Sequence, residues 1–152
     1  MEIERKYLVA SLPEGYEVFP HAEIEQGYLC TSPTVRVRRY GERYILTVKE
    51  RCSTASTAIH NREEEFVLSR EAYQKLRSKC EGRMVVKTRY RIPLDEGLTA
   101  ELDIFHDAHE GLMLVEVEFP DTRSADRFVP PAWFGMDVSR DPRYRNSCLA
   151  LE

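Results

Sequence analysis

Apolar and polar residues alternate one by one along most of this chain. In the segment Thr34–Tyr40, Val35 and Val37 alternate with Arg36 and Arg38. A period of two residues places successive side chains on opposite faces of a β-strand. The alternation predicts eight strands, near Glu2–Val9, Ile24–Cys30, Thr34–Tyr40, Arg43–Glu50, Asn61–Leu68, Met84–Ile92, Thr99–His106 and Leu112–Phe119. The chain is therefore expected to be mainly β.

Short connections indicate that neighbouring strands run antiparallel. Gly41-Glu42 is typical of a tight hairpin turn, and Asp95-Glu96-Gly97 is typical of a second reversal. Eight antiparallel strands can close into a barrel that is wide enough to hold one small ligand. No internal repeat or composition change divides the chain, so we expect a single domain over residues 1–152.

A few helices are expected to cover this barrel. One is predicted over Arg70–Lys79 with Ser69 as its N-cap, a short one over Ser124–Val129, and a C-terminal one from about Arg143 to Leu151. The Ser- and Thr-rich segment Cys52–His60 is expected to form a mobile loop between the fourth and fifth strands.

The charged residues of the predicted strands are segregated by sign. Residues i and i+2 share a strand face, and by this rule some strands carry acidic pairs, with Lys6 beside Glu2 and Glu4 on the first, while others carry basic groups. The acidic pairs are Glu2 with Glu4, Glu63 with Glu65, Glu101 with Asp103, and Glu116 with Glu118; the basic residues are Arg36, Arg38, Lys49, Lys87, Arg89 and Arg91. Each pair alone would fit the solvated face of an ordinary antiparallel strand. Together they favour a functional interpretation, because a solvated face usually mixes charges of both signs.

The segregated charges predict a barrel whose interior is polar. Paired carboxylates suit a divalent cation, and paired basic groups suit a polyanion. If the charged faces point inward, the apolar faces point outward and the helices must cover them. Burying so much charge is costly unless metal and ligand compensate it.

Overall composition excludes several other classes of protein. The chain has 26 acidic and 22 basic residues and a formal net charge of -4, which makes it a poor general binder of nucleic acids or membranes. No apolar run approaches the ~20 residues of a membrane-spanning helix, and no secretory signal is expected. The four cysteines form no C-x-x-C pair, so we interpret them as reduced thiols of a cytoplasmic protein.

The opening Glu2-Ile3-Glu4-Arg5-Lys6 resembles the E-x-E-x-K signature of CYTH domains, also called triphosphate tunnel metalloenzymes. The similarity covers nearly the whole chain and includes Arg36-Val37-Arg38, Arg62-Glu63-Glu64-Glu65, Lys87-Thr88-Arg89-Tyr90 and Val115-Glu116-Val117-Glu118. It implies an eight-stranded tunnel, a small-molecule triphosphate substrate and a Mg²⁺ or Mn²⁺ cofactor.

The resemblance also implies roles for individual residues. One metal ion would be held by Glu2, Glu4, Glu116 and Glu118, and a second metal ion or the attacking water would face Glu63, Glu65 and Asp103. The phosphate chain would be bound by Lys6, Arg36, Arg38, Lys49, Lys87 and Arg89, of which Lys87 is also a candidate for catalysis. Glu101 is a weaker candidate, Arg91 is expected at the tunnel mouth, and either Arg143 or Arg145 could reach the tunnel from the C-terminal helix.

Three functions fit these features. The first is hydrolysis of a triphosphate, with inorganic tripolyphosphate ahead of nucleoside or thiamine triphosphate because the short chain leaves little sequence for an organic moiety. The second is an adenylate cyclase of class IV, which would make cyclic AMP and pyrophosphate. The third is a non-catalytic module that binds polyphosphate or nucleotide. The sequence does not decide the preferred metal or the oligomeric state.

Overall fold

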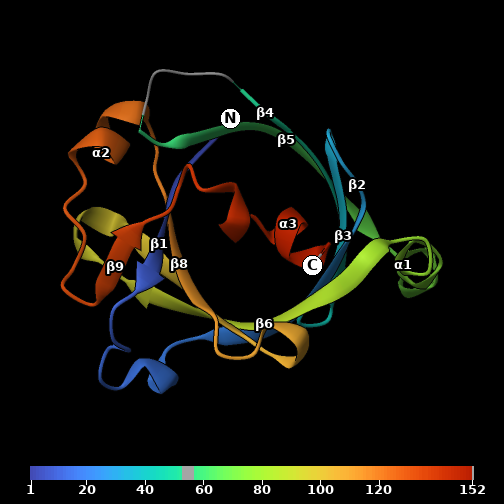
Figure 1. The fold of residues 1–152 in the computed structure, drawn as a ribbon, viewed down its shortest axis with the longest axis horizontal. Coiled ribbons are helices and arrows are strands. Elements are labelled where there is room, and N and C mark those ends of the chain that lie inside the picture. Colours follow the sequence, from blue (N-terminus) through green and yellow to red (C-terminus); the bar gives the residue numbers. More distant parts are fainter. Residues whose placement is uncertain (53–56, 152) are drawn as a thin grey trace.

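The computed structural model describes residues 1–52 and 57–151. Within these residues, nine strands form one antiparallel sheet in the order β5-β4-β3-β2-β6-β7-β8-β1-β9, and β5 also pairs with β1. The additional pairing closes eight strands into a barrel, which Figure 1 shows as a ring of strands with α3 drawn inside it. The strands are β1 (Glu2–Val9), β2 (His21–Thr31), β3 (Thr34–Tyr40), β4 (Arg43–Arg51), β5 (Ile59–Leu68), β6 (Glu81–Pro93), β7 (Thr99–Phe105), β8 (Met113–Glu118) and β9 (Phe134–Asp137).

The eight predicted strands correspond to β1–β8, and the closed barrel is confirmed. The ninth strand was not predicted. β9 has four residues and contains Gly135, so it is too short to show an alternating pattern. It pairs with β1 at Tyr7 and Val9, whereas β5 pairs with β1 at Glu2–Glu4. β1 therefore pairs with β8 and also with two further strands, β5 near its start and β9 near its end.

The helices are short. They are α1 (Arg70–Arg77), α2 (Thr122–Arg127) and α3 (Asn146–Ala150), with 3₁₀ turns η1 (Tyr16–Val18), η2 (Asp95–Gly97), η3 (Asp107–His109) and η4 (Pro142–Tyr144). The Ser69 hydroxyl caps α1 as expected and accepts a hydrogen bond from the Ala72 amide at 3.1 Å. The cap of α2 is Asp121, so this helix begins two residues earlier than predicted.

Two predictions near the loops and the C-terminus were partly wrong. The expected C-terminal helix is divided into η4 and α3, because Arg145 has an extended backbone between them. Ile59 and His60, expected in a loop, belong to β5, and residues 53–56 of that loop lie outside the described part of the chain. Within the described residues, no helix has both the length and the apolar character needed to cross a membrane.

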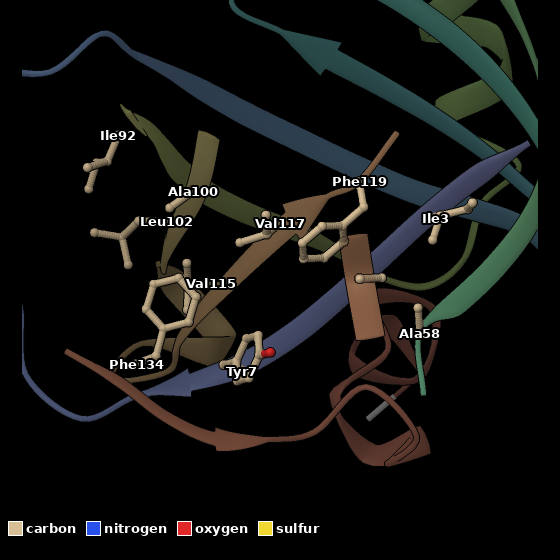
Figure 2. Packing of buried hydrophobic residues seen from close by; sticks show 11 residues of the cluster. Ile3, Tyr7, Ala58, Ile92, Ala100, Leu102, Val115, Val117, Phe119 and Phe134 are labelled. Carbon is tan, nitrogen blue, oxygen red and sulfur yellow. The ribbon is translucent and has the colours of Figure 1, made fainter. Parts of the chain in front are cut away.

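The main hydrophobic core lies outside the barrel wall. Apolar side chains of β1, β7 and β8 pack under the segment that carries α2 and β9, and Figure 2 shows Tyr7 facing Phe134 in this cluster. The centroids of these two rings are 5.0 Å apart. A smaller core surrounds α3, where Val85, Phe105 and Leu149 are buried together. The apolar faces of β1, β7 and β8 are thus covered from outside, and the charged faces of these strands point inward.

Candidate functional site

A large polar cavity occupies the interior of the barrel. Its volume is about 1260 Å³, and side chains from all eight barrel strands line it. Helix α3 lies within the ring of strands and contributes Asn146, Ser147 and Cys148 to the lining (Figure 1). The period-2 alternation of the strands is the direct cause of this arrangement, because it sends every second side chain into the cavity.

Most of the predicted site residues meet in this cavity. The lining includes the acidic residues Glu2, Glu4, Glu63, Glu65, Glu101, Glu116 and Glu118 and the basic residues Lys6, Arg36, Arg38, Lys49, Arg89 and Arg91. Lys87 and Asp103 are buried but do not line the cavity. Of the two C-terminal arginines, Arg145 lines the cavity, whereas Arg143 pairs with Asp141 at 2.7 Å.

The carboxylate of Asp103 is paired with two buried basic side chains, those of Arg89, which lines the cavity, and Lys87. Its Oδ1 accepts a hydrogen bond from Arg89 Nε at 2.8 Å, and its Oδ2 accepts one from Arg89 Nη2 at 2.9 Å. The Lys87 ammonium lies 2.7 Å from the same Oδ2. Burial alone would raise the pKa of Asp103, but Arg89 and Lys87 hold it below the usual value. This arrangement suits Asp103 to orienting the two basic side chains.

The ammonium groups of Lys6 and Lys49 are distributed among the acidic side chains. Lys6 lies 3.4 Å from Glu116, and Lys49 lies 2.9 Å from Glu2 and 3.8 Å from Glu63. Among the described residues, no group of three or more carboxylate, histidine or cysteine side chains is arranged to hold a metal ion as it stands. The carboxylates that were predicted to gather around a metal are thus partly paired with lysines.

Two glutamates keep a strong tendency to remain protonated. Burial, together with the negative charges of Glu116 and Glu2, raises the pKa of Glu4 to about 8. Burial and the neighbouring Glu2 raise the pKa of Glu63 to about 7, and the two carboxyl groups share a hydrogen bond. Burial also raises the pKa of Glu118. This part of the cavity therefore contains more carboxylate charge than its lysines neutralise.

The pKa values of Glu116 and Glu2 are shifted in the opposite direction, below the ordinary value. Although burial opposes ionisation, Lys6 with Arg89 and Lys87 holds the pKa of Glu116 well below the usual range. Lys49 likewise outweighs burial and lowers the pKa of Glu2. The pKa of each of these carboxyl groups thus reflects the balance between burial, neighbouring carboxyl groups and the basic side chains close to it.

The basic part of the cavity is crowded. Burial and the charges of Arg36 and Arg89 lower the pKa of Arg38 to about 9. The buried Arg36 Nε has no hydrogen-bond partner among the described residues, although its Nη2 donates to Thr47 at 3.2 Å. Such a cluster of like charges needs an anion of several negative charges.

Several lining residues were not predicted from the sequence. Asn61 donates a hydrogen bond to Glu2 at 3.0 Å and lies two positions before Glu63, so the alternation of β5 contained a signal for it. Arg51 lines the cavity on the side of Arg145; its pKa is lowered by burial and by Arg145, although Glu4 opposes the shift. Only the fold brings Arg51 and Arg145 together, since 94 positions separate them in the sequence (145 − 51).

Known proteins with a similar sequence share almost the full length of this chain. No protein-family model matches it. It is 43% identical over 155 residues to an inorganic triphosphatase of Nitrosomonas europaea, covering 99% of this chain and 97% of that protein. It is 36% identical over 152 residues to an inorganic triphosphatase of Acetivibrio thermocellus, covering 97% and 92%. A crystal structure of an inorganic triphosphatase superposes with a TM-score of 0.72 at 38% identity, covering 100% of this chain and 95% of that one.

Proposed function

This chain belongs to the CYTH family of triphosphate tunnel enzymes, and from that premise we propose that it hydrolyses inorganic tripolyphosphate to orthophosphate and pyrophosphate. The observation that carries the proposal is the polar interior of the barrel, in which basic side chains of β3 and β6 face a cavity that also contains unneutralised carboxyl groups. A triphosphate bound with a divalent cation would neutralise both kinds of charge at once.

The basic residues would hold the phosphate chain. Arg36, Arg38 and Arg89 reach the cavity from two strands, and Lys6 and Lys49 reach it from two others. Guanidinium groups bind phosphate oxygens in pairs, and ammonium groups act as point charges. Lys87 supports this set through its ion pair with Asp103, which also binds Arg89.

The acidic residues fit a divalent cation. Mg²⁺ and Mn²⁺ prefer carboxylate oxygens. Burial and neighbouring carboxyl groups raise the pKa values of Glu4 and Glu63, and a divalent cation would favour their charged forms. We propose that Glu2, Glu4, Glu116 and Glu118 hold one metal ion, with Glu63 and Glu65 available to a second. A bound divalent cation would neutralise the charge that develops on the phosphate oxygens.

Glu63 is suited to take the proton of the attacking water. Its pKa of about 7 matches that of an effective general base near neutral pH. In the reaction, the water oxygen forms a bond to the terminal phosphorus, the bridging P–O bond breaks, and pyrophosphate leaves. The water proton passes to the Glu63 carboxylate. The contribution of the protein is chiefly positioning and charge neutralisation, as in other phosphoryl transfers.

One set of incubations tests the function. The purified chain is incubated with Mg²⁺ or Mn²⁺ and tripolyphosphate, pyrophosphate, ATP or thiamine triphosphate, and the products are identified by ³¹P NMR and chromatography. Orthophosphate with pyrophosphate from tripolyphosphate supports the proposal. Cyclic AMP from ATP would identify a cyclase, and tight binding without turnover would identify a binding module.

Adjacent residues of β5 provide a matched control for the role of Glu63. Glu63→Gln should reduce kcat for tripolyphosphate on the order of 10²-fold or more. Glu64→Gln changes the next side chain, which faces outward. It should leave kcat within about twofold of wild type, because surface substitutions usually change free energies by no more than about 0.5 kcal/mol. Equal rates for the two variants would remove Glu63 from the mechanism.

A further inference from the structure

We propose that Gln26 is a positioning residue of the phosphate-binding site, which orients Arg38 and Tyr28 so that their free donor groups face the cavity. This inference rests on the proposed function, because it assumes that the cavity binds a polyphosphate. It concerns a residue that touches neither solvent nor the cavity, and it follows from the hydrogen bonds of a single buried amide.

The sheet places Gln26 between two strands of the basic region. It lies on β2 opposite Arg38 of β3 on one side and opposite Val85 of β6 on the other. Its side chain is 0% exposed. A buried amide must satisfy its hydrogen-bonding groups internally, because an unpaired one costs free energy. The partners of Gln26 therefore have a defined geometry.

The chemistry of Arg38 decides which way the amide of Gln26 faces. Arg38 Nε lies 2.8 Å from Gln26 Oε1, and Gln26 Nε2 lies 3.2 Å from the Tyr28 hydroxyl. A guanidinium can only donate, so the carbonyl oxygen of the amide must be the atom beside it. The amide nitrogen is then left to face Tyr28, and it can only donate.

One consequence concerns the guanidinium of Arg38. Its Nε is used by Gln26, which fixes the plane of the group and leaves both terminal nitrogens without a partner among the described residues. Arg36 and Arg89 repel this guanidinium and would drive it away from them if it were not held. Gln26 thus keeps the paired donors of Arg38 in the cavity, where phosphate oxygens can accept from them.

A second consequence concerns the hydroxyl of Tyr28. This side chain is buried against the cavity, and its oxygen accepts the hydrogen bond from Gln26. A phenol has only one proton to donate. Because its oxygen is occupied as an acceptor, that proton remains available for an oxygen of the bound substrate. Gln26 therefore makes Tyr28 a donor toward the cavity.

Two substitutions of Gln26 and one control distinguish its positioning of Arg38 and Tyr28 from a contribution to the packing of the barrel. Gln26→Met keeps the length of the side chain but removes both hydrogen bonds. Gln26→Glu keeps an acceptor for Arg38, but it would also accept the Tyr28 proton and offset the Arg38 charge. The control is Val37→Ala, which damages the packing of a fully buried residue on β3 that faces away from the cavity.

The readouts are calorimetric affinity for tripolyphosphate in the absence of metal, and kcat and KM in its presence. We expect Gln26→Met to weaken binding and raise KM on the order of 10-fold to 10²-fold, the size of effect that misplaced binding groups produce. Gln26→Glu should weaken both further, whereas Val37→Ala should lower only the melting temperature. In a Tyr28→Phe, Arg38→Ala background, Gln26→Met should change affinity less than about twofold.

The possible failures are distinguishable. If wild type binds tripolyphosphate but does not hydrolyse it, the proposed function is wrong, and the affinity measurements still test Gln26. If Gln26→Met and Gln26→Glu both bind and hydrolyse like wild type, the positioning role is wrong while the function stands. Full additivity of Gln26→Met in the double-variant background would also overturn it. Should Gln26→Met fail to fold, Gln26→Glu carries the same comparison.

Discussion

Two glutamates on neighbouring strands have opposite pKa shifts although they line the same cavity. Glu4 and Glu116 face the same interior, yet the pKa of Glu4 is raised to about 8 and that of Glu116 is lowered. Glu116 has the Lys6 ammonium 3.4 Å away and Arg89 and Lys87 nearby, whereas Glu4 is buried between the carboxyl groups of Glu116 and Glu2. Folding therefore disfavours the charge on Glu4 and favours the charge on Glu116.

This contrast predicts opposite effects on stability. In the presence of a chelator at pH 8, Glu4→Gln should raise the melting temperature, because it removes a carboxyl group whose ionisation opposes folding. Glu116→Gln should lower it, because it leaves Lys6 without its partner in a buried site. Both variants should lose most turnover if the two residues hold metal. Calorimetry and the phosphate-release assay measure the two effects, and a shared sign of the melting shifts would contradict the charge assignments.

At the scale of elements, the position of α3 depends on a close approach to β6. Gly82 has φ +67°, and a Cβ atom at this position would collide with the carbonyl group of Ala150. Two lysines also hold the C-terminal segment: Lys6 donates to the Tyr144 carbonyl at 3.0 Å and Lys87 donates to Asn146 at 3.2 Å. The segment therefore contacts the barrel through both its backbone and the phosphate-binding side chains.

Gly82→Ala should detach α3, and Gly15→Ala is its matched control. Both glycines have a positive φ, but no atom lies within 4 Å of a Cβ built on Gly15. Gly15→Ala should therefore cost only the backbone strain, about 1–2 kcal/mol, without affecting α3. Gly82→Ala should also abolish the protection of residues 148–151 in amide hydrogen exchange. Equal exchange in the two variants would show that the close approach does not hold the helix.

At the scale of the whole molecule, the interior charge makes stability depend on pH. The folded pKa values of Glu4 and Glu63 are about 8 and about 7, against an ordinary value of 4.5. Between pH 5 and 7, the folded protein thus retains protons that the unfolded chain has lost, so the free energy of unfolding falls as pH rises. Burial lowers the pKa of Lys87 to about 7 from 10.5. Above pH 7 the folded protein has lost this proton while the unfolded chain keeps it, so the cost of burying the charged lysine is relieved and the free energy of unfolding rises with pH.

The metal-free protein should therefore be least stable near pH 7–8. Urea denaturation in the presence of a chelator, repeated from pH 5 to 9, measures the free energy of unfolding directly. Glu4→Gln should make the free energy of unfolding fall less between pH 5 and the minimum. It should leave the rise of this free energy above pH 8 unchanged. A free energy of unfolding that rises steadily from pH 5 to 7 would be incompatible with the protonated state of Glu4 and Glu63.

The number of basic groups predicts how the cavity distinguishes polyphosphates. Tripolyphosphate offers a third phosphate group to side chains from four strands, and each charge-assisted contact contributes about 1.5–3 kcal/mol. Losing two such contacts would weaken binding on the order of 10²-fold or more. Tripolyphosphate should thus raise the melting temperature of chelator-treated protein far more than pyrophosphate does. Arg38→Ala should reduce this difference, whereas Arg39→Ala, on the outward face of the same strand, should not.

Strand alternation and the sign of charges could be interpreted from the sequence because both are local. The period of two in β3 places Arg36 and Arg38 on one face without reference to any partner strand. The closed barrel directs that face inward. The short strand β9 and the division of the C-terminal segment at Arg145 could not be predicted. The first depends on pairing with β1, and the second depends on docking inside the barrel.

The sequence by itself determined the eight strands and most of the charged residues that line the cavity, because alternation fixes which side chains share a face; Arg51 lines it without having been predicted, and Lys87 and Asp103 are buried beside it. The tertiary structure alone decided which charges are neutralised by which neighbours. Asp103 lies beside Arg89 and Lys87, and Glu4 lacks the lysine that Glu116 has. Those pairings depend on sheet register and burial, and electrostatic energies vary steeply with distance and solvent exposure.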